Sequence, residues 1–204
     1  MNKIIDVSEY NGNIDWKKVR ATGIDFAILK ITKKTNKPDG KFYANASGCD
    51  GEKIGWDVYK YSYAKDEAAS EAEAKVIVNI LKAMEAEGTT VWWDMEDYTL
   101  RNLGKAKLTR NVKAAQRIVE AAGYTFGIYC NKDWYNNILD VKEFDCPFWI
   151  ARYPYTNILP LNYTPNVKYK PVTKYGHKLV GWQYTSKGRV DGVAGNVDIS
   201  MLYV

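Results

Sequence analysis

Histidine is almost absent from this chain of 204 residues, which contains only His177. A single histidine cannot build a His-rich zinc site, so zinc amidases and metallopeptidases are excluded. It also disfavours a Ser–His–Asp array. We therefore predict no metal site and no cofactor, and we assign His177 to a loop without a catalytic part. If the chain is a hydrolase, its acid–base chemistry must rest on carboxylates.

Cysteine and long apolar runs are also scarce. The three cysteines are widely spaced and odd in number, which excludes a disulfide framework. Asp6 and Glu9 interrupt the N-terminal segment, so it lacks the apolar core of a secretory signal peptide. No apolar run approaches the roughly 20 residues of a membrane span. We expect a protein made in the cytoplasm without a signal peptide of its own.

Acidic residues are missing from the whole segment 146–190. Its net charge is +7, and because the whole chain carries +5, the remainder carries −2. Such a segment is either a solvated basic surface or a site of attraction for an anionic polymer. Nucleic acid is disfavoured as the partner, since no known binding motif and no compact cluster of basic residues are present. The basic residues are Arg152, Lys168, Lys170, Lys174, Lys178, Lys187 and Arg189.

A repeated unit runs through the first two thirds of the chain: an amphipathic helix, a glycine and a hydrophobic strand. We predict helices from Trp16 to Ala21, from Asp66 to Gly88 and from Thr109 to Gly123, with the glycines as left-handed caps. The predicted strands are Lys3–Val7, Ile24–Ile31, Trp56–Tyr63, Thr89–Glu96, Tyr124–Cys130, Pro147–Ala151 and Leu179–Tyr184, the last of these taken as the final core strand.

Alternating helices and strands predict a mostly parallel sheet, either a closed barrel or an open doubly wound sheet. An open dinucleotide-binding sheet needs a glycine-rich turn after its first strand, and neither that turn nor a P-loop is present. The regular pattern fails in residues 152–178, which are rich in Tyr, Pro, Asn and Lys. We therefore predict an α/β fold in one domain, residues 1–204: an irregular (β/α) TIM-like barrel with a degenerate C-terminal third.

Two carboxylates mark the end of one predicted strand. Asp94 and Glu96 are two residues apart, so on a strand they point to the same face, with Trp92 beneath them. Barrel enzymes keep their sites at this end of the strands. Repulsion between the two groups should raise one pKa and prepare a general acid at neutral pH. The alternative is a strand end that simply passes into a polar loop.

A glycosidic bond needs both an acid and a supporting carboxylate. Sugars also stack on aromatic rings, which make up 14% of this chain. By strand alternation, Tyr59, Tyr61 and Tyr63 share one face, and Trp149 and Tyr153 share another. The residues thus favour a carbohydrate substrate.

Six segments, in order, resemble family 25 of the glycoside hydrolases, the N-acetylmuramidase lysozymes found among phage endolysins and bacterial autolysins. The resemblance covers the chain from end to end, and the six together are far more specific than any one. The matching segments are Asp6-Val7-Ser8, Trp93-Asp94-Met95-Glu96, Gly127-Ile128-Tyr129, Trp149-Ile150-Ala151-Arg152-Tyr153, Trp182-Gln183-Tyr184-Thr185 and Gly195-Asn196-Val197-Asp198.

The resemblance implies cleavage of the β-1,4 bond between N-acetylmuramic acid and N-acetylglucosamine. Glu96 would be the proton donor, and Asp94 would stabilise charge or orient the 2-acetamido group of the substrate. Asp6 and Asp198 would complete an acidic cluster; Asp191 is a rival for the fourth acid, but it lies in a turn-like sequence. The candidate substrate-binding residues are Tyr61, Tyr129, Trp149, Tyr153, Gln183 and Lys30.

The chain also departs from the family pattern. After Lys30, where the family usually has an acidic-Gly turn, the segment from Lys33 to Lys37 contains three lysines. The 204 residues contain no cell-wall-binding repeats, so we expect either a stand-alone enzyme or the catalytic part of a longer endolysin. The basic segment 146–190 is a candidate anchor to anionic wall polymers. The expected partner is the glycan of bacterial peptidoglycan, reached after phage- or lysis-dependent release.

Two other functions compete with the muramidase. One is a barrel that binds wall glycans without cutting them, although such a binder does not need a pair of carboxylates. The other is a chitinase, whose longer acidic run is missing because Thr90, Val91, Trp92 and Trp93 precede Asp94.

Overall fold

The computed structural model describes residues 2–203. Its strands are β1 (Asn2–Val7), β2 (Phe26–Lys30), β3 (Gly55–Tyr61), β4 (Thr90–Asp94), β5 (Thr125–Asn131), β6 (Phe148–Ala151), β7 (Leu159–Pro160), β8 (Leu179–Arg189) and β9 (Val197–Leu202). Its α-helices are α1 (Trp16–Ala21), α2 (Phe42–Gly51), α3 (Glu67–Ala83) and α4 (Lys105–Ala121). None of the helices within residues 2–203 is both long enough and apolar enough to cross a membrane.

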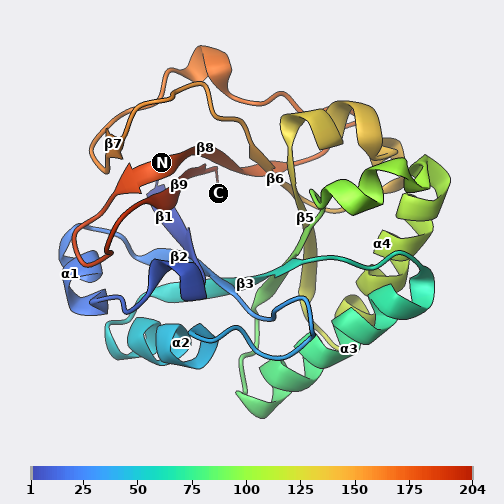
Figure 1. Ribbon diagram of the computed structural model, residues 1–204, viewed down its shortest axis with the longest axis horizontal. Helices are drawn as coiled ribbons and strands as arrows, with labels where there is room; N and C mark the ends of the chain where they lie inside the picture. Colours follow the sequence, from blue (N-terminus) through green and yellow to red (C-terminus); the bar gives the residue numbers. More distant parts are fainter. Residues whose placement is uncertain (1, 204) are drawn as a thin grey trace.

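The strands close into a barrel, which confirms the predicted fold class (Figure 1). Strands β1 to β6 pair in parallel in chain order, and β6 pairs in parallel with β8. Strand β9 then fills the gap between β8 and β1 and is antiparallel to both. The short strand β7 pairs only with the far end of β8.

The prediction that Leu179–Tyr184 forms the last core strand is wrong, because β9 follows it and completes the barrel. The sequence of β9 does carry a strand signal, since Val197, Ile199 and Met201 alternate and are all buried. This strand places Asp198 beside Asp6 of β1 as a register partner. Strand β9 thus brings Asp198, near the C-terminus, next to Asp6, near the N-terminus.

Helices cover only part of the barrel. In Figure 1, α1 to α4 lie outside strands β1 to β5, while loops and a short 3-10 turn (Val167–Tyr169) run along the side of β7 and β8. The predicted irregular C-terminal third is therefore confirmed.

Helix α2 was not predicted, because it lacks a side-chain cap at Lys41 and contains two glycines. Gly48 has a packing reason: a Cβ there would lie 2.1 Å from Cδ1 of Trp16. Two predicted helix boundaries are also wrong. Helix α3 ends at Ala83, before Gly88: Met84 is its cap, Glu85 follows with a φ of +54°, and Gly88 lies further on with a φ of +76°. Helix α4 begins at Lys105 rather than Thr109.

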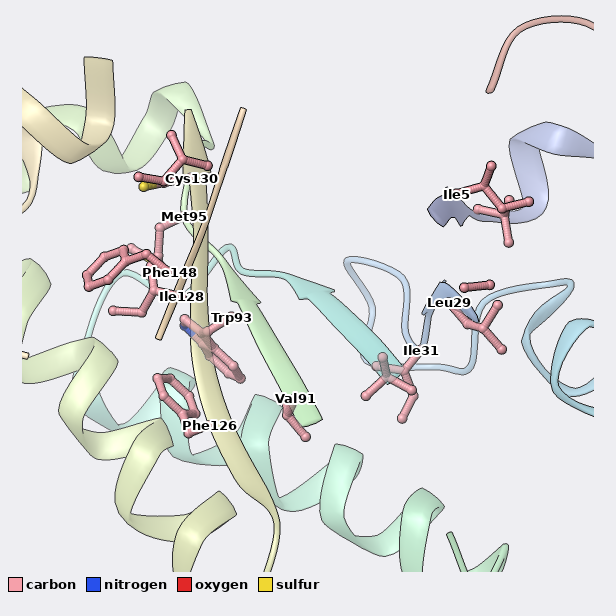
Figure 2. Close-up of a cluster of buried hydrophobic side chains, with 14 of the residues drawn as sticks. Ile5, Leu29, Ile31, Val91, Trp93, Met95, Phe126, Ile128, Cys130 and Phe148 are labelled. Atoms are coloured by element: carbon pink, nitrogen blue, oxygen red, sulfur yellow. The ribbon is translucent and has the colours of Figure 1, made fainter. Parts of the chain in front are cut away.

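Two layers of apolar side chains hold the barrel. The outer layer lies between the strands and the helices, and Figure 2 shows part of it, with Trp93 and Phe126 close to the helices. The inner layer fills the barrel with Trp92 and Trp149, whose ring centroids are 5.9 Å apart. Gly127 makes room for this layer, because a Cβ there would lie 2.6 Å from the Trp92 ring.

Candidate active site

A pocket of about 230 Å³ opens at the carboxyl ends of the strands and contains all four predicted acids. Asp6 comes from β1, Asp94 ends β4, Glu96 lies two residues beyond, and Asp198 comes from β9. Asp94 and Glu96 line the same pocket, as predicted, but the prediction that Glu96 lies on the strand is wrong, because β4 ends at Asp94. The pocket is lined by Asp6, Tyr59, Tyr61, Asp94, Glu96, Tyr129, Trp149, Tyr153, Gln183 and Asp198.

Asp198, and not its rival Asp191, belongs to the acidic cluster. Asp198 lies directly opposite Asp6 in the β1–β9 pairing, and both line the pocket. Asp191 is exposed and lies in the turn before β9, where Gly192 has a φ of +95°. Burial, followed by the charge of Glu96, raises the pKa of Asp198 to about 7.

Gln183 joins the two sides of the pocket through its side-chain amide. Its Nε2 donates to Oδ2 of Asp6 at 2.8 Å, and its Oε1 accepts from the Tyr129 hydroxyl at 2.7 Å. The Tyr153 hydroxyl donates to the same Oε1. Burial and the nearby Asp198 nevertheless raise the pKa of Asp6 well above its usual value, against the opposing effect of the Gln183 hydrogen bond.

Asp94 is the most deeply buried of the four acids, with 3% of its surface exposed. Its Oδ1 accepts no hydrogen bond from any residue in the range 2–203. Burial is the main cause that raises its pKa well above the usual value; the charge of Glu96 adds to this, and Lys30 opposes it. An unsatisfied buried carboxylate oxygen is costly, so this atom is available to a group that enters the pocket.

Glu96 is partly exposed at the mouth of the pocket, and burial raises its pKa. A hydrogen bond from the Asn131 side chain acts in the opposite direction. The Asn131 Oδ1 accepts from the backbone N–H groups of Asp133 and Trp134, at 3.0 and 3.1 Å. These two bonds fix the amide, whose NH2 group then remains to act on Glu96. Sequence reasoning missed Asn131, although it stands at the end of β5, where site residues gather.

Five of the six predicted substrate-binding residues line the pocket, and Lys30 does not. Tyr61, Tyr129, Tyr153 and Gln183 line the pocket beside the acids. Trp149 forms its floor, with 2% of its surface exposed and its Nε1 donating to Ser200 Oγ at 3.0 Å.

Lys30 lies outside the pocket lining, with its ammonium 5.7 Å from the ring centroid of Tyr61. Tyr59 also lines the pocket, although the sequence predicted only that it shares a strand face with Tyr61.

His177 lies in a loop far from the acids. Its ring contacts the Tyr135 hydroxyl and the Phe144 carbonyl oxygen, at 3.0 Å each. It lines a larger cavity, about 960 Å³, which opens where β4, β5 and β6 begin and so lies at the other end of the barrel. Among residues 2–203, no group of three or more His, Cys, Asp or Glu side chains is placed to hold a metal ion.

A barrel that presents paired carboxylates and aromatic rings at the carboxyl ends of its strands is typical of enzymes that cleave glycosidic bonds. The family model described as "Glycosyl hydrolases family 25" matches residues 5–193, and the chain belongs to this family.

Several relatives are similar over nearly the whole chain. Lysozyme M1 of Streptomyces globisporus is 24% identical over 95% of the chain, and the autolytic lysozyme of Clostridium acetobutylicum is 25% identical over 97% of it. The autolysin LytC of Streptococcus pneumoniae, solved with a synthetic peptidoglycan ligand, superposes with a TM-score of 0.80 at 25% identity over 99% of the chain. A lysozyme from Streptomyces coelicolor, 22% identical, shares the fold with a TM-score of 0.77 over 100% of this chain and 92% of its own. The chain spans 65%, 54% and 46% of the first three relatives.

The raised pKa of Asp198 predicts a pH-dependent cost in stability. In the unfolded chain an aspartate loses its proton near pH 4, whereas Asp198 in the folded protein keeps it to about pH 7. Ionisation therefore favours the unfolded state as the pH rises between these values. Asp198→Asn should raise the free energy of unfolding by about 1 kcal/mol or more at pH 8, measured by urea denaturation.

The gain should vanish near pH 4, where the carboxyl is protonated in both states. Asp191→Asn is the matched control, because Asp191 is exposed. Equal effects of the two substitutions, or a gain that persists unchanged at pH 4, would contradict this reading of the pocket.

Proposed function

We propose that this chain is a lysozyme that hydrolyses the β-1,4 bond between N-acetylmuramic acid and N-acetylglucosamine in peptidoglycan. The observation that carries the proposal is the pair Asp94 and Glu96 in one pocket, together with Asp6 and Asp198. Membership of family 25 and the names of the lysozyme relatives support it. The LytC complex, described with a synthetic peptidoglycan ligand, supports the same class of substrate.

Glu96 acts as the general acid in this proposal. It lies at the pocket mouth, partly exposed, where a leaving-group oxygen can approach it. Burial raises its pKa, which favours the protonated form that an acid needs at the start of the reaction. Asn131 donates to the carboxylate that remains after proton transfer, and so stabilises the product of that step.

Asp94 orients the 2-acetamido group of the substrate or, in its ionised form, stabilises the developing positive charge. Its Oδ1 accepts no hydrogen bond within the described part of the chain, so an N–H group of the substrate can satisfy it. A substrate N–H bound there would also remove the free-energy cost of leaving the buried Asp94 Oδ1 without a hydrogen bond. Asp6 and Asp198 hold the sugar and raise the pKa values of their neighbours, and the pocket tyrosines provide rings for the sugar faces.

The alternative is a barrel that binds wall glycans without cutting them. Such a binder could use the tyrosines and Gln183, but it has no need of several buried acids with raised pKa values. Carboxyl groups placed close together lower the stability of the fold, and such groups are common where an enzyme uses them for proton transfer. The cluster therefore favours the enzyme.

Glu96→Gln should abolish the general acid while keeping the shape of the side chain. We expect the rate of clearing of Gram-positive cell walls, followed by turbidity, to fall at least about 100-fold. Glu87→Gln is the matched control, since Glu87 is exposed and lines a separate pocket. Equal clearing by the wild type and Glu96→Gln would show that Glu96 is not the acid, and no clearing by the wild type would favour the binding barrel.

Asn131→Ala should change the pH profile of the same activity. Loss of the hydrogen bond removes an effect that lowers the pKa of Glu96, so this pKa should rise further. Because the acid must carry its proton, the alkaline limb of the kcat/KM profile should move to higher pH. Asn136→Ala, which removes a contact to the Lys132 carbonyl oxygen, serves as the control. An unmoved or lowered alkaline limb would contradict this role of Asn131.

We further propose that the basic segment 146–190 attracts anionic wall polymers, and that the chain acts on the cell wall after phage- or lysis-dependent release. Lys168, Lys174, Lys178, Lys187 and Arg189 of this segment are exposed. Some of its cations also make contacts within the chain: Lys170 lies 3.9 Å from the ring centroid of Tyr203, and Lys187 donates to the Thr156 carbonyl oxygen.

At low salt, intact walls should therefore be cleared faster than walls stripped of teichoic acid, and this difference should disappear as salt is added. Equal rates on both kinds of wall at low salt would overturn the proposed attraction.

A further inference from the structure

The lysine-rich segment that follows β2 forms an ordered turn beside the pocket. An isolated bridge joins Thr32 to Pro38, and the Lys33 N–H donates to the Lys37 carbonyl oxygen at 2.8 Å. Asn36 takes the left-handed conformation, with a φ of +59°. Because the turn follows the carboxyl end of a barrel strand, it lies at the same end of the barrel as the acids.

A buried lysine anchors this turn from below. Lys60, on β3, has none of its surface exposed. Its ammonium donates to the Lys33 carbonyl oxygen and to Asn36 Oδ1, at 3.0 Å each, and lies 3.6 Å from Oε1 of Glu73. The Glu73 carboxylate also accepts from the Ser62 hydroxyl at 2.7 Å. Lys60 thus pairs with Glu73 and uses its other ammonium hydrogens to bind the turn, which holds the turn in one position.

The lysines of the turn differ in their partners. Lys33 forms an ion pair with Glu9 at 2.6 Å, so its charge is largely compensated. Lys34 is exposed, and it takes part in none of the ion pairs formed by residues 2–203. Its ammonium lies 4.9 Å from the ring centroid of Tyr63.

The position of Lys34 connects it to the pocket. The rings of Tyr63 and Tyr61 are 4.8 Å apart, and Tyr61 lines the pocket. The Lys30 ammonium also lies near the Tyr61 ring, 5.7 Å from its centroid. Lys34, a cation without an ion-pair partner among residues 2–203, is thus connected to the pocket through the rings of Tyr63 and Tyr61.

We propose that Lys34 binds the carboxylates of the peptide stem of peptidoglycan, and so determines specificity for strands with charged stems. This inference rests on the proposed function, because the stem is attached to muramic acid, the sugar next to the bond that would be cut. Its free carboxylates are anionic groups close to that bond, and an ammonium is a compact point charge suited to them. The Tyr63 ring keeps the ammonium near the pocket edge.

The test uses glycan strands freed of wall phosphate polymers, in three forms: with charged stems, with stem carboxylates converted to amides, and with stems removed by an amidase. The wild type is compared with Lys34→Gln, Lys34→Arg and Lys82→Gln. Lys82 is an exposed lysine near the end of α3, beside a separate pocket, and is the matched control.

On charged stems, Lys34→Gln should lower kcat/KM about threefold at low salt, mainly through KM. The effect should fade in about 0.5 M salt, and Lys34→Arg and Lys82→Gln should behave as the wild type. On amidated and stem-free strands, Lys34→Gln should equal the wild type.

An equal loss on all three substrates would assign Lys34 to the glycan itself and overturn the inference. So would no loss on charged stems, or the same loss in Lys82→Gln. If the wild type cleaves none of the three substrates, the proposed function fails and this inference fails with it.

Discussion

The structure depends on one electrostatic constraint, the confinement of four carboxyl groups, two of them buried and two partly buried, in one small pocket. Asp6, Asp94, Glu96 and Asp198 share one opening of about 230 Å³. Burial is the first cause of the raised pKa of each group, and repulsion adds to it for Asp6, Asp94 and Asp198. Four full charges cannot coexist there at neutral pH, so the cluster keeps protons that acid–base chemistry can use.

The rest of the barrel holds this unfavourable cluster in place. Strand β9 closes the sheet against β1 and sets Asp198 opposite Asp6. Gln183 ties Asp6 to Tyr129, and beneath them Trp149 packs into the barrel and excludes water. Stability gained in the two apolar layers offsets the cost of the acids, a distribution common at functional sites. At the edge of the pocket, the buried Lys60 likewise holds in place the turn that carries Lys34.

Local patterns in the sequence predicted much of the fold and of the candidate site, but they did not predict the contacts between residues far apart in the chain. The spacing of two residues predicted that Asp94 and Glu96 would share a site, although Glu96 lies beyond the end of β4. The repeated helix, glycine and strand indicated the barrel. Sequence alone does not show which distant residues meet: Gln183 and Asp6 are 177 positions apart. Asn131 escaped notice because its role depends on how the following turn orients its amide. Helix α2 was missed partly because it contains Gly48, a helix-weakening residue that its close packing on Trp16 requires.

The most direct test of the central claim is a titration of the carboxyl carbons of the wild type by NMR, with each resonance assigned through its Asn or Gln variant. The account predicts that Asp198 titrates near pH 7 and that Asp6 and Asp94 also keep their protons far above the usual range of an aspartate. If all four carboxyls titrate below about pH 5, near the values of unperturbed side chains, the pocket does not store protons and the account is contradicted.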